Sequence, residues 1–279
     1  MSASMILRCP FLRLPGAAVA AVISMLVVAA PYQALAGACG DDVGGQRVAC
    51  KCGDNVVSDT VLGSSDPIVS EPCSGDGLVV LVPSGSDGIT LSLGGNSMVG
   101  SGSGTGIRVA HGGRLGSAII GGDAGDTRAE IANFGTGIRA SGRLAVREVR
   151  SIDIHANRDD GLKIRSSGVR VEDVRSERNG RNGVALSGHG IEVSGVVAAG
   201  NIRDGLKVRG AGANIDAETT GNRRNGTVIG GRGSRASKIR STDNGGAGVV
   251  ATGEGHAVAD LQASGNAAGE VAGRAGALQ

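Results

Sequence analysis

Short runs of alternating aliphatic and polar residues recur along most of the chain. Typical runs are residues 162–165, 184–187 and 206–209, in which every second residue is aliphatic. Alternation with a period of two predicts β-strands that bury one face and expose the other. A second run of the same kind follows in each unit, for example at residues 169–171 and 191–193. The pattern predicts an all-β chain with no helix longer than a cap.

The strands belong to an internal repeat that is marked by asparagines. Six asparagines follow one another at steps of 22, 22, 21, 22 and 22 residues, and a glycine stands four residues after each of the first five. We expect Asn133 with Gly137 to extend this register upstream. The six positions are Asn157, Asn179, Asn201, Asn222, Asn244 and Asn266.

The nearly constant length of the repeat predicts a coil. Asn-x-x-Asp-Gly before an alternating run is also compatible with a two-residue hairpin, but hairpins do not require units of equal length. Propeller blades need about twice as many residues. We therefore predict a parallel solenoid with about 22 residues per coil and rungs about 4.8 Å apart. The asparagines should stack as a ladder that tolerates a left-handed turn, and the following glycines should meet the same backbone demand.

The repeats resemble those of a known family. Residues 157–164 and 201–208 look like the parallel β-helix repeats of the pectate-lyase-like superfamily, and residues 73–78 and 87–93 resemble the first turns of exported bacterial β-helix proteins. The resemblance covers roughly residues 39–273 and implies a right-handed parallel β-helix. It does not imply one function, because the superfamily includes lyases, hydrolases, epimerases and adhesins.

The first 36 residues look like a secretory signal peptide. Arg8 and Arg13 precede an apolar run at residues 17–30, and Ala-Leu-Ala ends the segment. Fourteen residues are too few to cross a bilayer comfortably. Lipidation at Cys39 is disfavoured because Ala36 rather than leucine lies three positions before it. We expect a secreted, periplasmic or cell-envelope protein with no membrane span after cleavage.

The predicted organisation is a signal peptide at 1–36, a disulfide-bonded cap at 37–76, the parallel β-helix at 77–273 and a tail at 274–279.

Composition narrows the possible classes. With 51 glycines and three aromatic residues, the core must be filled by small aliphatic side chains in a regular arrangement. The glycines follow no period of three, which excludes collagen, and 40% hydrophobic residues disfavour disorder. Loss of the two signal arginines lowers the formal net charge from +2 to zero, which disfavours a general nucleic-acid binder. No oligomeric state is predicted.

Four cysteines lie in the predicted cap. An even, clustered set in an exported chain predicts disulfides. A bond between Cys50 and Cys52 would close a very tight ring, so each of them should pair with Cys39 or Cys73. We favour Cys39–Cys50 and Cys52–Cys73. Zinc is the rival interpretation, but the Cys-x-Cys spacing lacks the second half of a structural zinc site.

Two motifs resemble parts of the polygalacturonase active site, namely Asp159-Asp160 and Gly188-His189-Gly190. Their positions in the repeat differ by seven residues, or roughly 20 Å of extended chain. The Asn-Thr-Asp element of those enzymes is missing, as is the Asp-Pro-His-Asp element of alginate epimerases. The histidines occupy different positions in the repeat and are predicted to be surface or turn residues: His111, His155, His189 and His256.

A row of cations is the stronger candidate site. Arg108, Arg139, Lys163 and Lys207 share one outward strand position, and Arg165 and Arg209 lie two residues further on. Ala185 and Ser187 stand on the rung between, which places Lys163 and Lys207 about 9.6 Å apart. We expect a noncatalytic exported protein that binds acidic polysaccharide along this row.

The resemblance also implies an alternative, a lyase acting on polyuronates with Lys163, Arg165, Lys207 or Arg209 as its base. No cofactor is expected other than calcium, for which Asp159, Asp160 and Asp204 are candidate ligands. The simplest interpretation is that the cations keep an exposed sheet soluble and that Asp-Gly makes the turns.

Overall fold

The structure is a computed structural model and describes residues 37–83, 85–111, 117–122 and 128–273. The predicted signal peptide at 1–36 and the predicted tail at 274–279 lie outside the described residues. No helix in the described ranges is long and apolar enough to cross a membrane.

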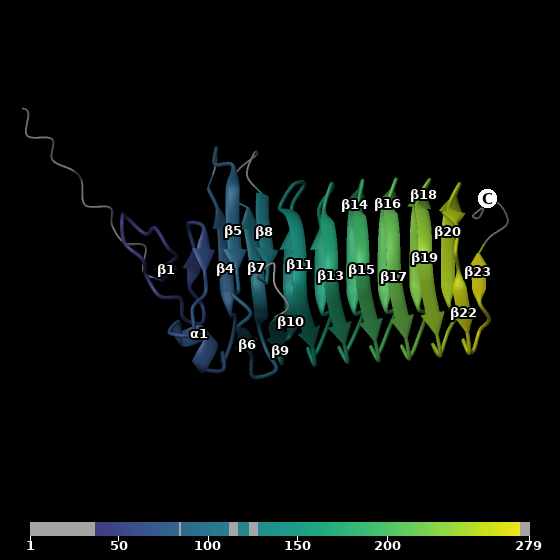
Figure 1. The fold of residues 1–279 in the computed structure, drawn as a ribbon, viewed down its shortest axis with the longest axis horizontal. Helices are drawn as coiled ribbons and strands as arrows, with labels where there is room; N and C mark the ends of the chain where they lie inside the picture. The colour runs from purple at the N-terminus through teal and green to yellow at the C-terminus, as the bar shows by residue number, and fades with distance from the viewer. Residues whose placement is uncertain (1–36, 84, 112–116, 123–127, 274–279) are drawn as a thin grey trace, which may run out of the picture. The chain divides into compact units, whose positions relative to one another are not determined.

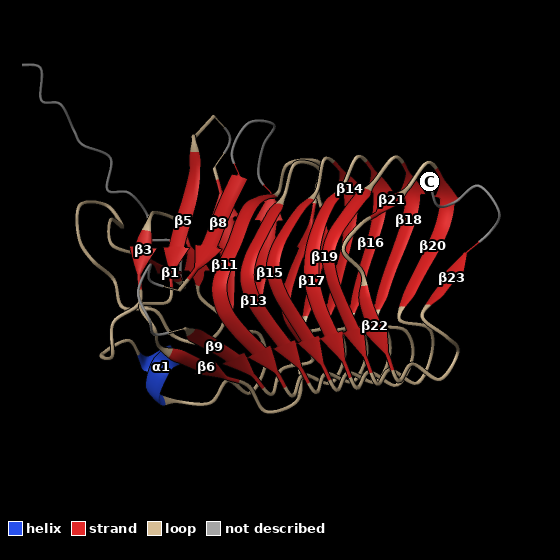
Figure 2. Cartoon of the chain, turned by 45° about the vertical axis from the view of Figure 1, so that its right-hand side comes forward, coloured by secondary structure: helices blue, strands red, loops and turns tan. Residues whose placement is uncertain are grey.

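Strands stack one above another in two long sheets (Figures 1 and 2). The first sheet contains β1 (Ala38–Cys39), β2 (Asn55–Val56), β4 (Leu78–Val82), β7 (Thr105–His111), β10 (Thr136–Ser141), β12 (Leu162–Arg165), β14 (Val184–His189), β16 (Leu206–Ala211), β18 (Thr227–Arg232), β20 (Val249–Glu254) and β23 (Val271–Gly273). The second contains β3 (Thr60–Val61), β5 (Gly88–Ser92), β6 (Ser97–Val99), β8 (Ser117–Gly121), β9 (Ala129–Ala132), β11 (Val146–His155), β13 (Arg170–Glu177), β15 (Glu192–Ala199), β17 (Asn214–Thr220), β19 (Arg235–Thr242), β21 (Ala257–Val258) and β22 (Gln262–Ser264).

Pairing between these strands is parallel, and neighbours in each sheet come from successive turns of the chain. In the first sheet, Leu162 pairs with Val184, which pairs with Leu206. The predicted parallel β-solenoid of about 22 residues per coil is therefore confirmed. Among the described residues, helix is limited to α1 (Pro67–Ser70).

The alternating runs place aliphatic side chains inside the coil and polar side chains outside. In β12, Leu162 and Ile164 are fully buried, whereas Lys163 and Arg165 face outward. Each buried Leu, Ile or Val contributes about 1.5–3 kcal/mol of hydrophobic stabilisation. Since equivalent positions stack on one another, the core is a set of aliphatic columns, and only one aromatic residue, Phe134, is among its buried members.

Strands of the second sheet bend at a residue with left-handed backbone. These residues are Ser151, Asp173, Gly195 and Lys238, with φ of 52°, 52°, 61° and 51°. The first half of β11 pairs with β8 and its second half with β9, so the sheet covers two sides of the coil. In β17 only one residue separates Ile215 from Ala217, whereas two separate Val193 from Val196 in β15. The 21-residue step arises here, because this turn lacks the left-handed residue.

The six predicted asparagines form a ladder at one corner of the coil. Nδ2 of each donates to Oδ1 of the next at 2.8–3.0 Å. The same Oδ1 also accepts the backbone N–H of the preceding asparagine at 3.0–3.1 Å. The amides thus point in one direction. Oδ1 of Asn157 accepts the N–H of Phe134 at one end, and Nδ2 of Asn266 donates to the Glu270 carboxylate at the other.

Three details of this corner correct the sequence-based prediction. The left-handed backbone belongs to the residue before each ladder asparagine, as at Arg178, where φ is 52°. The glycine four residues after each asparagine is required by space, because a Cβ on Gly183 would lie 2.6 Å from Nδ2 of Asn201. Asn133 itself occupies the left-handed position with φ 59°, and Phe134 stands in the ladder row, so Asn133 is one residue out of register.

The amino-terminal cap contains both favoured disulfides, Cys39–Cys50 and Cys52–Cys73. All four sulfurs are therefore engaged in disulfides rather than in a zinc site. The buried Asp66 carboxylate holds the same region together. It accepts the N–H groups of Cys50 and Gly63 and forms an ion pair with Arg47 at 2.7 Å. Strands β2 and β3 of the cap pair with β4 and β5 of the coil, so the cap continues both sheets.

Candidate functional site

The outward faces of β7, β10, β12 and β16 carry the predicted row of cations. Arg108 pairs with Arg139, which pairs with Lys163 on the following rung. Ala185 separates Lys163 from Lys207, as expected. Arg165 and Arg209 form the next outward column, with Ser187 between them. Arg108, on β7, lies at the amino-terminal end of this row and forms an ion pair with Asp76 at 3.6 Å.

A second polar ladder runs beside these cations. The Oδ1 atom of Asp160 accepts the Nδ2–H of Asn182 at 2.7 Å, Oδ1 of Asn182 accepts the N–H of Asp204 at 3.3 Å, and Oδ1 of Asp204 accepts the Nδ2–H of Asn225 at 2.9 Å. Because Asp160 and Asp204 are 3% and 2% exposed, their charges need partners. Hydrogen bonds satisfy only part of that need.

Lys163 and Lys207 supply the compensating charges. The Nζ of Lys163 lies 3.3 Å from Oδ2 of Asp160, and the Nζ of Lys207 lies 3.5 Å from Oδ2 of Asp204. These lysines therefore neutralise buried carboxylates within their own rungs. This role differs from the one predicted from the sequence, in which both lysines were free to bind a ligand.

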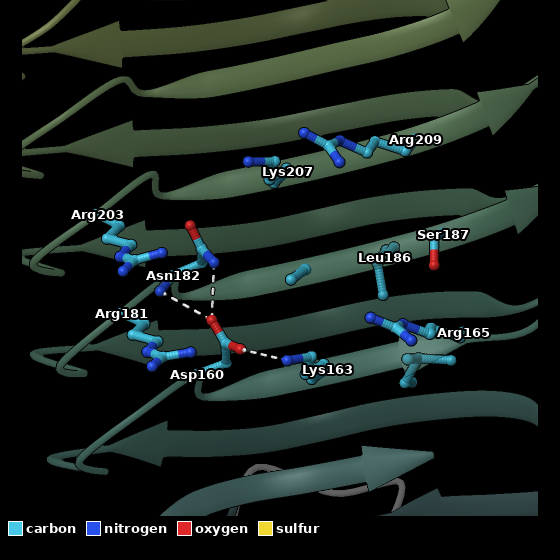
Figure 3. A pocket seen from close by; sticks show the side chains of 12 residues that line it. Asp160, Lys163, Arg165, Arg181, Asn182, Leu186, Ser187, Arg203, Lys207 and Arg209 are labelled. Carbon is cyan, nitrogen blue, oxygen red and sulfur yellow. Dashed lines mark hydrogen bonds and ion pairs between the residues drawn. The ribbon is translucent and has the colours of Figure 1, made fainter. Parts of the chain in front are cut away.

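Four cations of these two columns, Lys163, Arg165, Lys207 and Arg209, line a groove across β12, β14 and β16 (Figure 3), whereas Arg108 and Arg139 are not part of its lining. It has a cavity volume of about 220 Å³. Ala185 and Ser187 belong to its lining on the middle rung, between the basic residues of β12 and β16. Its charged lining residues are Asp160, Lys163, Arg165, Arg181, Arg203, Lys207 and Arg209.

Three guanidinium groups give the groove its uncompensated positive charge. Arg165, Arg203 and Arg209 have no ion pair in the described part of the chain. The fourth arginine, Arg181, has its Nε 2.9 Å from Oδ1 of Asp159. Guanidinium groups stay protonated and bind carboxylate, sulfate or phosphate groups through paired N–H donors. The groove is therefore suited to an anionic ligand.

The three predicted calcium ligands do not converge. Asp159 faces Arg181, whereas Asp160 and Asp204 are each engaged by a lysine and an asparagine on different rungs. Within the described ranges, no three acidic, histidine or cysteine side chains lie together as a metal site would require.

Three histidines, His155, His189 and His256, have side chains that the structure describes, and they lie apart from one another, but His256 is not a surface residue. His256 is fully buried, with its Nδ1 3.3 Å from the N–H of Ser234 and its Nε2 3.3 Å from the carbonyl of Thr252. It lies next to Ser234 on the preceding rung, and the backbone partners of both ring nitrogens make burial possible. His155 lies on the second sheet, 2.7 Å from Glu130.

The Gly188-His189-Gly190 motif is part of the coil rather than of an active site. Glycine recurs at the equivalent of Gly188 on the following rungs, because a Cβ on Gly210 would lie 1.5 Å from the carbonyl oxygen of Gly188. Gly190 has φ of 60° and so fits a turn. His189 between them is exposed and is absent from the lining of the groove.

Sequence reasoning missed Arg181 and Arg203. Both lie at the corner, outside any strand, two residues after a ladder asparagine. The backbone N–H of Arg203 donates to the carbonyl of Arg181 at 3.0 Å, which stacks the two residues on successive rungs. A search of the corner positions for recurring charge, at a fixed offset from the ladder, would have found them.

Comparisons with known proteins add little to this geometry. No protein-family model matches the chain, and no curated protein matches it. Among solved structures, the chain is similar to the A-module of the mannuronan C-5 epimerase AlgE4 of Azotobacter vinelandii, at 13% identity over 78% of this chain and 88% of that module, with a TM-score of 0.31. A likeness this weak carries no functional argument, and the fold assignment rests on the strand pairing described above.

Proposed function

We propose that this chain is a noncatalytic, exported β-helix protein that binds acidic polysaccharide in the groove across β12, β14 and β16. One observation carries the proposal, namely the three guanidinium groups of Arg165, Arg203 and Arg209, which line one groove without an ion pair in the described residues. The two disulfides of the cap fit an exported protein.

A binding role is favoured over a lyase by the state of the lysines. Each candidate lysine base is within 3.5 Å of a buried carboxylate, so it is already engaged inside its own rung. Arginine is protonated at the pH values that proteins ordinarily meet. The candidate residues of the groove are therefore better suited to holding anions than to accepting a proton.

The test is a titration of fluorescently labelled polyuronate, followed by anisotropy. The double variant Arg165→Ala/Arg209→Ala should bind about tenfold more weakly, because two exposed ionic contacts of about 0.7 kcal/mol each are lost. Affinity should also fall with added salt. Arg235→Ala is the matched control, since Arg235 is an exposed arginine of the second sheet without an ion pair among the described residues, and it should leave affinity unchanged.

Three results would contradict the proposal. The first is an absence of polyuronate binding, and the second is an equal loss of affinity in the Arg235→Ala control. The third is accumulation of unsaturated uronate in an absorbance assay, abolished by Lys207→Ala with the fold intact, which would establish a lyase instead.

A further inference from the structure

Across the three strands of the groove, β12, β14 and β16, charged and neutral rungs alternate with a period of two rungs, whereas the sequence repeat is one rung. Three positions of each rung are involved: the second polar ladder and the two outward columns of the first sheet. Two rungs are charged at all three, and the rungs that follow them are neutral. The charged rungs carry Asp160, Lys163 and Arg165, then Asp204, Lys207 and Arg209; the neutral rungs carry Asn182, Ala185 and Ser187, then Asn225, Val228 and Gly230.

The fold does not require this alternation. Like charges opposite each other on neighbouring strands are mildly destabilising, yet Arg108, Arg139 and Lys163 occupy three successive rungs of one column. Arg203 and Arg224 also follow each other at the corner. Since the coil tolerates cations on adjacent rungs elsewhere, the neutral rung inside the groove needs another explanation.

The uncompensated charges of the groove follow the same period. In the outer column, Arg165 and Arg209 alternate with Ser141, Ser187 and Gly230. The two arginines are therefore about 9.6 Å apart along the coil, or two rung spacings. Arg203 lies on the second charged rung. Arg181 lies on the neutral rung, but its charge is taken up by Asp159.

A polysaccharide chain has a matching geometry. A linear pyranose chain advances by about the height of one rung per sugar. When it lies along the coil axis, every second sugar faces a charged rung and the intervening sugars face Ala185 and Ser187. An anionic group on an intervening sugar would leave water without meeting a free cation, which is unfavourable.

We propose that the groove selects polysaccharides that carry an anionic group on every second sugar over those that carry one on every sugar. The inference rests on the proposed function and adds to it the spacing of charge that the groove recognises. Arg165 and Arg209 provide the contacts, and Ser187 determines the spacing.

The test compares hyaluronan, in which uronate alternates with an uncharged N-acetylated amino sugar, with polygalacturonate, in which every sugar is a uronate. Oligosaccharides of equal length are titrated at physiological ionic strength. The wild-type chain should bind the hyaluronan fragment about fivefold more tightly, the effect of about one exposed ionic contact. Unspecific attraction acts in the opposite direction, because polygalacturonate has the higher charge density.

Two variants add the same charge to the same column and should act differently. Ser187→Arg places a cation on the neutral rung between Arg165 and Arg209, and it should abolish or reverse the preference. Thr252→Arg lies two rungs beyond Arg209 and continues the period, so it should strengthen hyaluronan binding and keep the preference. Far-UV circular dichroism checks that both variants fold.

The outcomes separate the two proposals. If polygalacturonate binds as tightly as hyaluronan or more tightly, or if both variants change the preference equally, the spacing rule is wrong while the groove remains a polyanion site. If neither polymer binds, the proposed function and the spacing rule both fail.

Discussion

Replacing Asn201 by alanine tests the asparagine ladder at its centre. Asn201 is fully buried. Its Oδ1 accepts the backbone N–H and the Nδ2–H of Asn179, both at 3.0 Å, and its Nδ2 donates to the Ser176 carbonyl and to Oδ1 of Asn222, both at 3.0 Å. In Asn201→Ala, the N–H of Asn179 and the carbonyl of Ser176 lose these partners. The Asn179 amide keeps Ser176 Oγ, and Asn222 Oδ1 keeps the backbone N–H of residue 201.

The Ser176 carbonyl stays in the parallel ladder between β11 and β15, whereas the buried N–H of Asn179 is left without a partner. One orphaned buried group costs about 1–3 kcal/mol, so the substitution should lower the free energy of unfolding by about 2 kcal/mol. The assay is guanidinium unfolding followed by far-UV circular dichroism, because the chain contains no tryptophan. Native-state hydrogen exchange should show lost protection at the amide of residue 179. Asn214→Ala is the control, since Asn214 is an exposed asparagine in β17, and it should stay within about 0.5 kcal/mol of wild type. A difference between the two variants below about 1 kcal/mol would refute the reasoning.

Three further predictions follow from single positions. Gly183→Ala should cost about 2 kcal/mol, because its Cβ meets Asn201, whereas Gly75→Ala, which meets nothing within 4 Å, should be nearly neutral; equal melting temperatures would contradict this. Thr227→Val should stabilise the chain by about 1 kcal/mol, since the Thr227 hydroxyl is buried among aliphatic residues without a hydrogen-bond partner in the described residues; a lower melting temperature would count against it. A hydrogen bond from the Ser97 hydroxyl, and then the contact with His155, hold the pKa of Glu130 below its ordinary value. The stabilisation by this carboxylate is therefore complete above the ordinary value and is lost as pH falls through the lowered one. Glu130→Gln should therefore flatten the decline of stability on acidification, and an unchanged pH profile would exclude a role for this carboxylate.

The coil was predictable because its signals are periodic. One row of asparagines gave the length of the turn, and alternation gave the inward and outward faces of strands such as β12. What could not be predicted was local to the corner. An asparagine that tolerates left-handed backbone looks the same in sequence as one whose amide fills a ladder, and Asn133 shows that both types occur in this chain. The glycine four residues after each asparagine is required because a side chain there would collide with the asparagine of the next rung. Reasoning about the sequence of a single turn does not reveal that contact.

The site was predicted in outline only. The outward row of Arg108, Arg139, Lys163 and Lys207 follows from strand alternation, which is a local property. The partners of the lysines were harder to assign, because Asp160 lies at a turn where Asp-Gly is explained equally well by backbone geometry. The depth to which its carboxylate is buried depends on the stacked rungs above and below. That burial turns Lys163 from a free cation into a neutralising one. It leaves Arg165, Arg203 and Arg209 as the groove cations without an ion pair among the described residues.

The one-directional asparagine ladder makes the chain length adjustable. Every turn offers its successor the same oxygen acceptor and amide donor, so a duplicated segment finds its bonding pattern already present at both junctions. Duplication of a single turn would place two charged rungs or two neutral rungs next to each other. Duplication of the 44 residues from Asp160 to Arg203, which form two turns, would keep charged and neutral rungs in alternation. Genetic change in pairs of turns would therefore lengthen the groove without altering the alternation of its charges.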